Sequence, residues 1–266
     1  MRKHLLLLAV LVVGLPAAGS AQEKKFEILD NSFLVEEAFN QERGIFQNIF
    51  GWSRDRTGEW SGNFTQEWPA PSITHQFSYT IPFAGGELPA HFGGILLNYR
   101  LQLFQEGDGR PAVSPRFSVI LPTGRFFDDS DRPGVQVNLP ASKQVGDFYV
   151  HVNAGATWLH GVRSGLTSRT NLTSPMLAGS VIWNTRPYVN LMLESVLTMQ
   201  DTVIDEQNTG LQRVATISPG VRGGWTLNDS QIILGAAVPV TFTEGEESAA
   251  AVLVYFSYEL PFSPNR

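Results

Sequence analysis

Residues 249–262 read AAAVLVYFSYELPF, and two kinds of side chain alternate along them. Every second residue from Val252 to Phe262 is apolar or aromatic, whereas those between, from Ala251 to Glu259, are mixed, small or charged. A two-residue period indicates a β-strand whose two faces meet different surroundings. A soluble sandwich strand would turn charge outward, but a membrane barrel strand presents an apolar row to lipid and allows a mixed lumen. The stretch therefore predicts the closing strand of a transmembrane barrel.

Eleven earlier segments carry the same period. They span approximately 45–55, 59–69, 72–82, 91–105, 112–123, 133–140, 147–160, 173–184, 187–199, 213–226 and 230–243. An even strand number places both ends of a barrel on one side of the membrane. The competing fold is a periplasmic β-sandwich or lipocalin-like protein, which would rarely carry an apolar row on nearly every strand. We predict an all-β, antiparallel transmembrane β-barrel of about 12 strands over residues 45–262, with 263–266 as a tail.

The connections alternate in length. Residues 69–71 and 185–187 suit tight periplasmic turns, and the longer, polar segments suit outer loops: 83–90, 124–132, 161–172 and 200–212. The short outer connection at 56–58 is an exception to this asymmetry.

Aromatic residues fall near the predicted strand ends. Trp60 and Trp68 share one face of a strand, eight residues apart. At about 3.3 Å per residue and a tilt near 40°, they differ by roughly 20 Å in height, close to the distance between the aromatic girdles of a barrel. The predicted girdle comprises Trp60, Trp68, Trp158, Trp183, Trp225 and Tyr258.

The first residues have the pattern of a secretory signal peptide. Arg2 and Lys3 precede a short apolar run over 5–13, and small residues follow, so we expect cleavage after Ala21. No run of about 20 apolar residues suits a transmembrane helix. We therefore assign 1–21 as a signal peptide and expect the cell outer membrane of a Gram-negative bacterium, with outer-membrane lipids and the barrel-assembly machinery as partners.

The composition supports this class. Charged residues make up 17% of the 266 residues, below the roughly 25% usual for soluble proteins. The chain has no cysteine, so it has no disulfide framework. Its net charge of −6 argues against nucleic acid as a partner.

Residues 22–44 lack the two-residue period. Asn31 and Ser32 are suited to cap a short helix there. Two alternatives stay open for this N-terminal extension: a periplasmic segment outside the barrel, or a plug folded into its lumen.

Charged strand residues lie opposite the apolar rows, and we expect them to face the lumen because a charge on lipid costs about 2–4 kcal/mol. They are Glu67, Arg100, Arg116, His151, Glu194, Arg222 and Glu259. One alternative is that opposite charges only brace the lumen, and the other is that they set the field along a solute path. The inward face also holds small and apolar residues such as Gly155 and Leu253, which suits modest, partly apolar solutes.

Three arginines are expected to face acids across the lumen, since Arg100 and Arg116 lie on neighbouring strands and would repel each other. The expected acids are Glu67, Glu194 and Glu259, and the contact most favoured is Arg222 with Glu259. On this arrangement Glu259→Gln would shift the ion selectivity of a conductance toward anions.

Enzymatic motifs are lacking. No G-x-S-x-G sequence occurs, and nothing in the sequence places a serine beside His151, so catalysis is not expected and a barrel lipid hydrolase is the weakest alternative. Residues 128–131 (DDSD) lack the spacing of an EF-hand loop and suggest a solvated acidic loop. Phosphate-loop, zinc and dinucleotide motifs are absent, so no metal or cofactor is expected.

Three stretches resemble a known family: SVILPTG at 118–124, SFLVEEAFNQE at 32–42 and FTQEWP at 64–69. They are similar to segments of an outer-membrane transporter family named for the meta-pathway of phenol degradation, and the resemblance would cover about 30–262. It implies an outer-membrane channel or transporter for small, aromatic or partly apolar organic solutes. The alternative is a structural barrel with a closed lumen.

Overall fold

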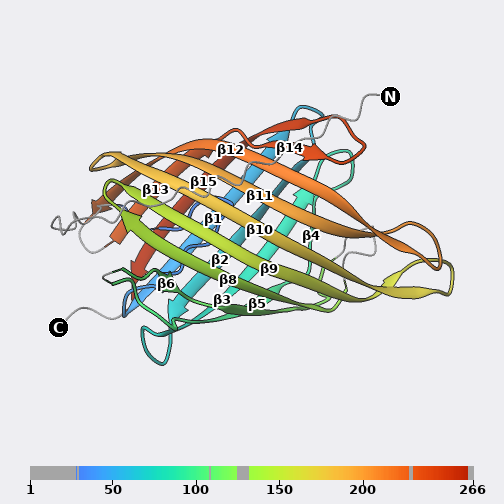
Figure 1. The fold of residues 1–266 in the computed structure, drawn as a ribbon, viewed down its shortest axis with the longest axis horizontal. Helices are drawn as coiled ribbons and strands as arrows, with labels where there is room; N and C mark the ends of the chain where they lie inside the picture. The colour runs from blue at the N-terminus through green and yellow to red at the C-terminus, as the bar shows by residue number, and fades with distance from the viewer. Residues whose placement is uncertain (1–27, 29, 108, 125–131, 228–229, 263–266) are drawn as a thin grey trace.

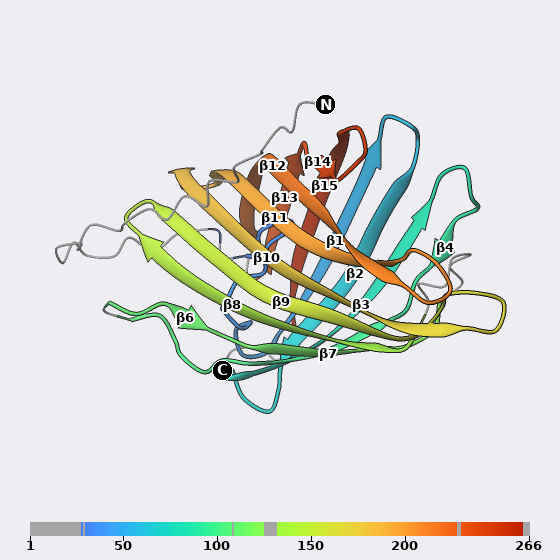
Figure 2. The ribbon, with the colours of Figure 1, turned by 45° about the vertical axis from the view of Figure 1, so that its right-hand side comes forward.

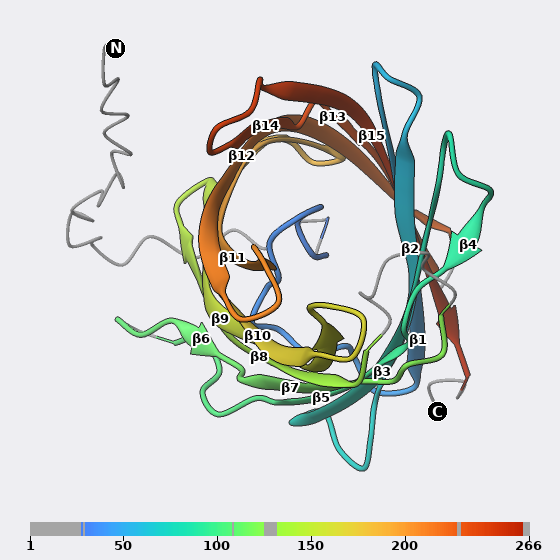
Figure 3. The same cartoon turned by 90° about the vertical axis from the view of Figure 1, so that its right-hand side faces the viewer.

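The strands close into a ring, seen from the side in Figures 1 and 2 and along its axis in Figure 3. This computed structural model describes residue 28 and residues 30–107, 109–124, 132–227 and 230–262. No helix within those ranges is long and apolar enough to cross a membrane. The predicted signal peptide, the DDSD loop and the tail lie outside the described residues.

Fifteen β-segments form the sheet, and neighbouring segments pair antiparallel. In chain order they are β1 (Ile45–Asp55), β2 (Trp60–Pro69), β3 (His75–Gly85), β4 (His91–Phe92), β5 (Leu96–Leu101), β6 (Ala112–Val113), β7 (Arg116–Ile120), β8 (Gly134–Val145), β9 (Phe148–Arg163), β10 (Arg169–Arg186), β11 (Val189–Val203), β12 (Thr209–Leu227), β13 (Ser230–Ala237), β14 (Val240–Thr243) and β15 (Ala249–Pro261).

These segments make twelve strands because three of the strands are interrupted. The breaks separate β4 from β5, β6 from β7, and β13 from β14. Pro115 and Pro239 stand in two of the breaks, where proline has no N–H to donate to a ladder, and Gly93 and Gly94 stand in the third. The predicted twelve-stranded antiparallel barrel is therefore confirmed, with interruptions that the two-residue period did not reveal.

The closing strand is the one expected. β15 pairs with β1 from Ile45 opposite Pro261 to Asp55 opposite Ala251, which joins the two ends of the sheet. Tyr255 and Ser257 are buried toward the lumen, whereas Val254 and Phe256 are exposed on the outer surface. Both ends of the barrel sequence lie at the same rim, which we take as the periplasmic rim because outer-membrane barrels keep both ends there.

Strands β9 to β12 are longer than predicted. They contain 16, 18, 15 and 19 residues and extend past the other strands at one end, on the right of Figure 1. The outer loops predicted at 161–172 and 200–212 are shorter in the structure, where they span 164–168 and 204–208. Strand pairing continues into these segments, but their residues are largely polar. They therefore lack the apolar row by which a membrane strand is recognised in the sequence.

The outer face carries an apolar band. Trp158 pairs with Thr173, which lies ten positions before Trp183 on β10. Ten residues at about 3.3 Å each, tilted near 40°, span roughly 25 Å, the height of the apolar band of such barrels. The six aromatic residues proposed as a girdle all stand on the outward side of their strands, since the buried lumen residues alternate with them.

Leu177 tests the position of this band. Its side chain is 57% exposed on β10, about midway between Thr173 and Trp183. Leu177→Arg should lower the free energy of unfolding by about 2–4 kcal/mol, because the charge would face hydrocarbon. The measurement is denaturant unfolding in phospholipid vesicles, followed by tryptophan fluorescence.

Leu211 is the matched control. It is 54% exposed, but it lies on the part of β12 that extends beyond the band. Leu211→Arg should cost at most about 1 kcal/mol. Equal losses at the two positions would contradict the band.

Candidate functional site

The lumen is occupied by the chain's own N-terminal segment, residue 28 and residues 30–44, which we call the plug (Figure 3). It contacts β12 and β13 near Ile28, reaches β10 and β11 at Ser32 and Leu34, and passes β8 and β5 before β1 begins at Ile45. The helix expected at Asn31 and Ser32 does not form. The Asn31 side chain instead accepts a hydrogen bond from the Glu37 backbone N–H, at 3.2 Å.

Side chains of the barrel wall satisfy the backbone of the plug. Glu194 Oε1 accepts the backbone N–H groups of Leu34 and Val35, at 2.8 and 3.1 Å. Asn153 accepts the Glu36 N–H at 2.9 Å and donates to the Glu36 carbonyl at 2.7 Å, as a neighbouring strand would. Among the described residues, no backbone–backbone hydrogen bond joins residues 30–41 to a strand.

The second half of the plug is held in the same way. Ser142 Oγ accepts the Ala38 N–H at 2.8 Å, while Ser114 and Gln102 donate to the Ala38 carbonyl at 2.7 and 2.8 Å. Gln76 then accepts the Gln41 N–H at 2.7 Å. Wall side chains from β3 round to β11 thus bind the backbone of the plug along its length.

Arg222 and Tyr255 hold the start of the plug. Arg222 Nη1 donates to the carbonyls of Asp30 and Asn31, at 2.9 and 2.7 Å, and the Tyr255 hydroxyl donates to the Asp30 carboxylate at 2.9 Å. Among the described residues no ion pair joins Arg222 to Glu259, so the contact predicted between them is wrong. The physical reason is that β13 separates the two strands and the plug carbonyls supply nearer acceptors.

Phe33 anchors the plug by packing. Its ring lies over Gly220 and Gly235. A Cβ added at Gly235 would overlap the ring, and one added at Gly220 would lie 3.1 Å from it. The centroid of the Phe33 ring is 4.9 Å from that of Tyr255. In the structure the recess at Gly235 is filled by the plug.

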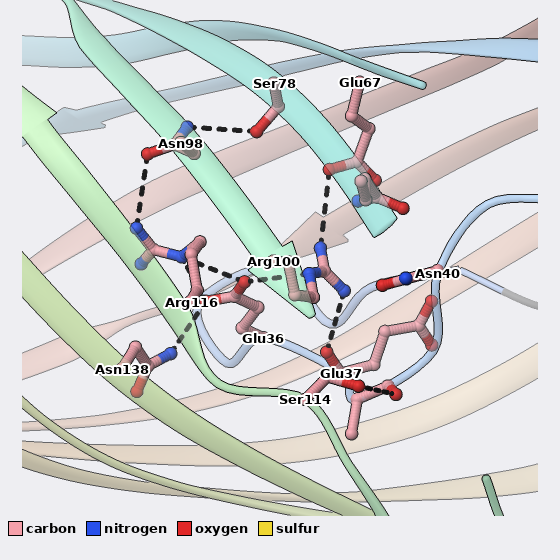
Figure 4. Close-up of polar contacts among 12 residues, drawn as sticks. Glu36, Glu37, Asn40, Glu67, Ser78, Asn98, Arg100, Ser114, Arg116 and Asn138 are labelled. Atoms are coloured by element: carbon pink, nitrogen blue, oxygen red, sulfur yellow. Dashed lines mark hydrogen bonds and ion pairs between the residues drawn. The ribbon is translucent and has the colours of Figure 1, made fainter. Parts of the chain in front are cut away.

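Glu36 connects the plug to the arginines of the wall (Figure 4). Arg116 Nε contacts both of its carboxylate oxygens, at 3.0 and 2.8 Å, and Arg100 Nε lies 3.5 Å from Oε1. Burial raises the pKa of Glu36, but Arg116 and Arg100 lower it further, so the pKa lies below its ordinary value. Glu36 is therefore held as a carboxylate.

The other predicted lumen residues differ in their contacts. Arg100 Nη2 lies 3.5 Å from Glu67, which is one of the expected pairs, and Arg100 Nη1 also donates to the carbonyls of Glu37 and Phe39. Within the described part of the chain, Glu194 forms no ion pair with an arginine and instead accepts hydrogen bonds from two plug amides. Glu259 is half-buried opposite Gln47 on β1. The sequence did not predict that Asp30 and Glu36 would contact the lumen residues. They lie in a segment without a two-residue period, so no strand register places their side chains.

Ser142 and His151 correct a further expectation. Ser142 Oγ lies 2.7 Å from His151 Nδ1, so a serine does stand beside this histidine. Both residues are buried beneath the plug, where Ser142 Oγ accepts the Ala38 N–H. His151 Nε2 has no hydrogen-bond partner within the described ranges, so no third group orients the ring as a catalytic triad requires. The pair serves to hold the plug.

A cavity of about 290 Å³ lies beside the plug, on its outer side. Residues 31–36 of the plug form one wall, and β1, β2, β3, β5, β7, β8 and β15 form the rest. The polar wall groups are mainly hydroxyls and amides, with two arginines and one glutamate at the inner end: Asn63, Thr65, Ser78, Thr80, Asn98, Gln136, Arg100, Arg116 and Glu67. In the part of the chain that the structure describes, no three acidic or histidine side chains group as a metal site would require.

The fold resembles those of solved outer-membrane proteins. The COG4313 outer membrane channel from Pseudomonas putida F1 superposes with a TM-score of 0.63 at 11% identity, over 84% of this chain and 98% of that one. The NanC porin superposes with a TM-score of 0.54 at 8% identity, over 81% of this chain and 100% of that one. No protein-family model matches the sequence, and the search of curated proteins finds no match. The likeness shows the fold, a β-barrel of the kind that these outer-membrane proteins have.

Glu194 is predicted to keep the plug in place. The chain has no cysteine, so Val35→Cys provides a unique label at a side chain that is 1% exposed. Adding Glu194→Ala removes two hydrogen bonds to the plug backbone, each worth about 1 kcal/mol. Maleimide labelling of Cys at position 35 should then become at least about tenfold faster.

The control for this experiment is Glu246→Ala, which removes an acid from an exposed outer loop. It should leave the labelling rate at position 35 unchanged. If Glu194→Ala labels no faster than this control, Glu194 does not hold the plug.

Proposed function

We propose that the protein is an outer-membrane channel for small organic solutes and that the plug closes it. The proposal rests on one observation: the segment that fills the lumen is attached to the wall through side chains and not through strand pairing. Water can replace such hydrogen bonds one at a time, so the segment can leave without opening the barrel.

The route of the plug supports a gate. Ile28 packs over Gly224 near the periplasmic end of β12, and the plug returns to the same rim at Ile45. A segment with both ends at one rim can withdraw without being threaded through the lumen. The alternative, a structural barrel with a closed lumen, would need no cavity on the outer side of the plug.

The cavity suggests the kind of solute. Phe33 and Tyr255 offer apolar surface on one side, and Thr65, Thr80 and Asn98 offer polar groups on the other. A small solute with an apolar body and a polar edge suits this lining, because pockets combine apolar surface with a few placed polar groups. Aromatic or partly apolar compounds, as the resemblance to the phenol-pathway family implies, are of this kind.

Release of the plug should open the channel. We expect small, intermittent single-channel conductance from the wild type in planar bilayers, because the plug occupies the lumen. Glu194→Ala combined with Arg222→Ala removes the side chains that hold residues 30, 31, 34 and 35, and should raise the mean conductance several-fold.

The matched control is Glu244→Ala combined with Arg213→Ala. These residues form an exposed ion pair of 3.0 Å at the outer end of the barrel, far from the plug. The control should conduct as the wild type does. A plug-released variant that folds, shown by its heat-dependent gel shift, but conducts no more than the control would contradict the proposal.

A further inference from the structure

Two arginines face each other on the lumen wall. Arg100 on β5 and Arg116 on β7 are direct cross-strand partners, and both point inward. Like charges directly opposite each other destabilise a sheet. The pair therefore requires an anion between the two guanidinium groups.

In the structure that anion is the carboxylate of Glu36 (Figure 4). Arg116 Nε binds it at 2.8 and 3.0 Å, Arg100 Nε approaches it at 3.5 Å, and Asn138 Nδ2 donates to it at 2.7 Å. Two guanidinium groups and an amide N–H thus converge on one carboxylate. Because Glu36 belongs to the plug, this anion leaves whenever the plug leaves.

Without Glu36, the wall around Arg100 and Arg116 keeps a net positive charge. Of the wall acids, Glu67 lies 3.5 Å from Arg100, so at most one negative charge remains against two positive charges. Arg100 is only 3% exposed, yet its Nε has no hydrogen-bond partner within the described ranges. Glu36 therefore fills the site incompletely, and a free carboxylate could approach Arg100 more closely.

The site is reached from the outer side. Arg100, Arg116 and Glu36 all line the 290 Å³ cavity, which extends past Asn98 toward Asn63 and Leu96. The Arg116 side chain is 16% exposed, against 4% for Arg100, so an entering solute meets Arg116 first.

We propose that Arg100, Arg116 and Asn138 form a binding site for the carboxylate of a small organic acid, and that Glu36 occupies this site while the plug is in place. The inference rests on the proposed channel function and specifies its solute class. A solute competes with Glu36 for the arginines, and its binding weakens one attachment of the plug. A tethered competitor acts at an effective concentration of about millimolar, so the solute must reach a similar concentration to displace it.

Binding of benzoate tests the site, with benzamide as the neutral analogue of the same shape. Equilibrium dialysis of the purified full-length barrel against each labelled compound gives the affinities. The wild type should bind benzoate weakly. Glu36→Gln removes the competing carboxylate and should tighten benzoate binding at least about tenfold, with benzamide unchanged.

Two variants on the wall complete the test. Arg116→Gln in the Glu36→Gln background should abolish the gain, and Arg116→Lys should restore only part of it because lysine cannot bind a carboxylate through two N–H groups. Glu244→Gln, which removes a charge in an exposed ion pair with Arg213, should behave as the wild type does.

The outcomes separate this inference from the proposed function. Benzoate binding that is no tighter in Glu36→Gln than in the wild type, or that survives Arg116→Gln, overturns the carboxylate site. If that happens while the plug-released variant conducts, the channel function stands without this solute class. If benzoate binds as predicted but the plug-released variant does not conduct, the channel function falls.

Discussion

The structure depends on the hydrogen bonds that wall side chains make to the backbone of the plug. A chain segment inside a barrel brings N–H and C=O groups that must find partners, and the strands cannot supply them because their own groups are paired with each other. Glu194, Asn153, Ser142 and Arg222 supply them instead. This requirement explains why the lumen wall contains so many buried amides, hydroxyls and charges.

The same interactions make the plug both ordered and removable. A hydrogen bond that is exchanged for one with water contributes only about 0.5–1.5 kcal/mol, or about 1.5–3 kcal/mol when one partner is charged. A plug held by such bonds is released at modest cost when water or a solute takes their place. Phe33, packed over Gly220 and Gly235, adds a contact that water cannot replace. The outer surface differs, since lipid offers no hydrogen bonds and every strand must remain paired.

The sequence predicted the barrel well because lipid imposes a sharp contrast between the two faces of each strand. Val254 and Tyr255 are sorted to opposite faces as expected. The prediction failed where that contrast ends: β9 to β12 continue beyond the apolar band through polar residues, and Pro115 and Pro239 interrupt strands whose period is otherwise intact. The inward position of Arg222 was predictable, but its partner was not. The Asp30 carbonyl lies 192 residues away in a segment without period, so nothing local indicates the contact.

The most direct test of the plugged barrel is a disulfide across the lumen. Ser32 on the plug and Ser180 on β10 have their hydroxyl oxygens 2.7 Å apart, and the chain has no cysteine of its own. The account predicts that Ser32→Cys with Ser180→Cys forms a disulfide in outer membranes, and that the oxidised protein gives no open-channel current until a reductant is added. Failure of the disulfide to form, or a current that is the same before and after reduction, would contradict it.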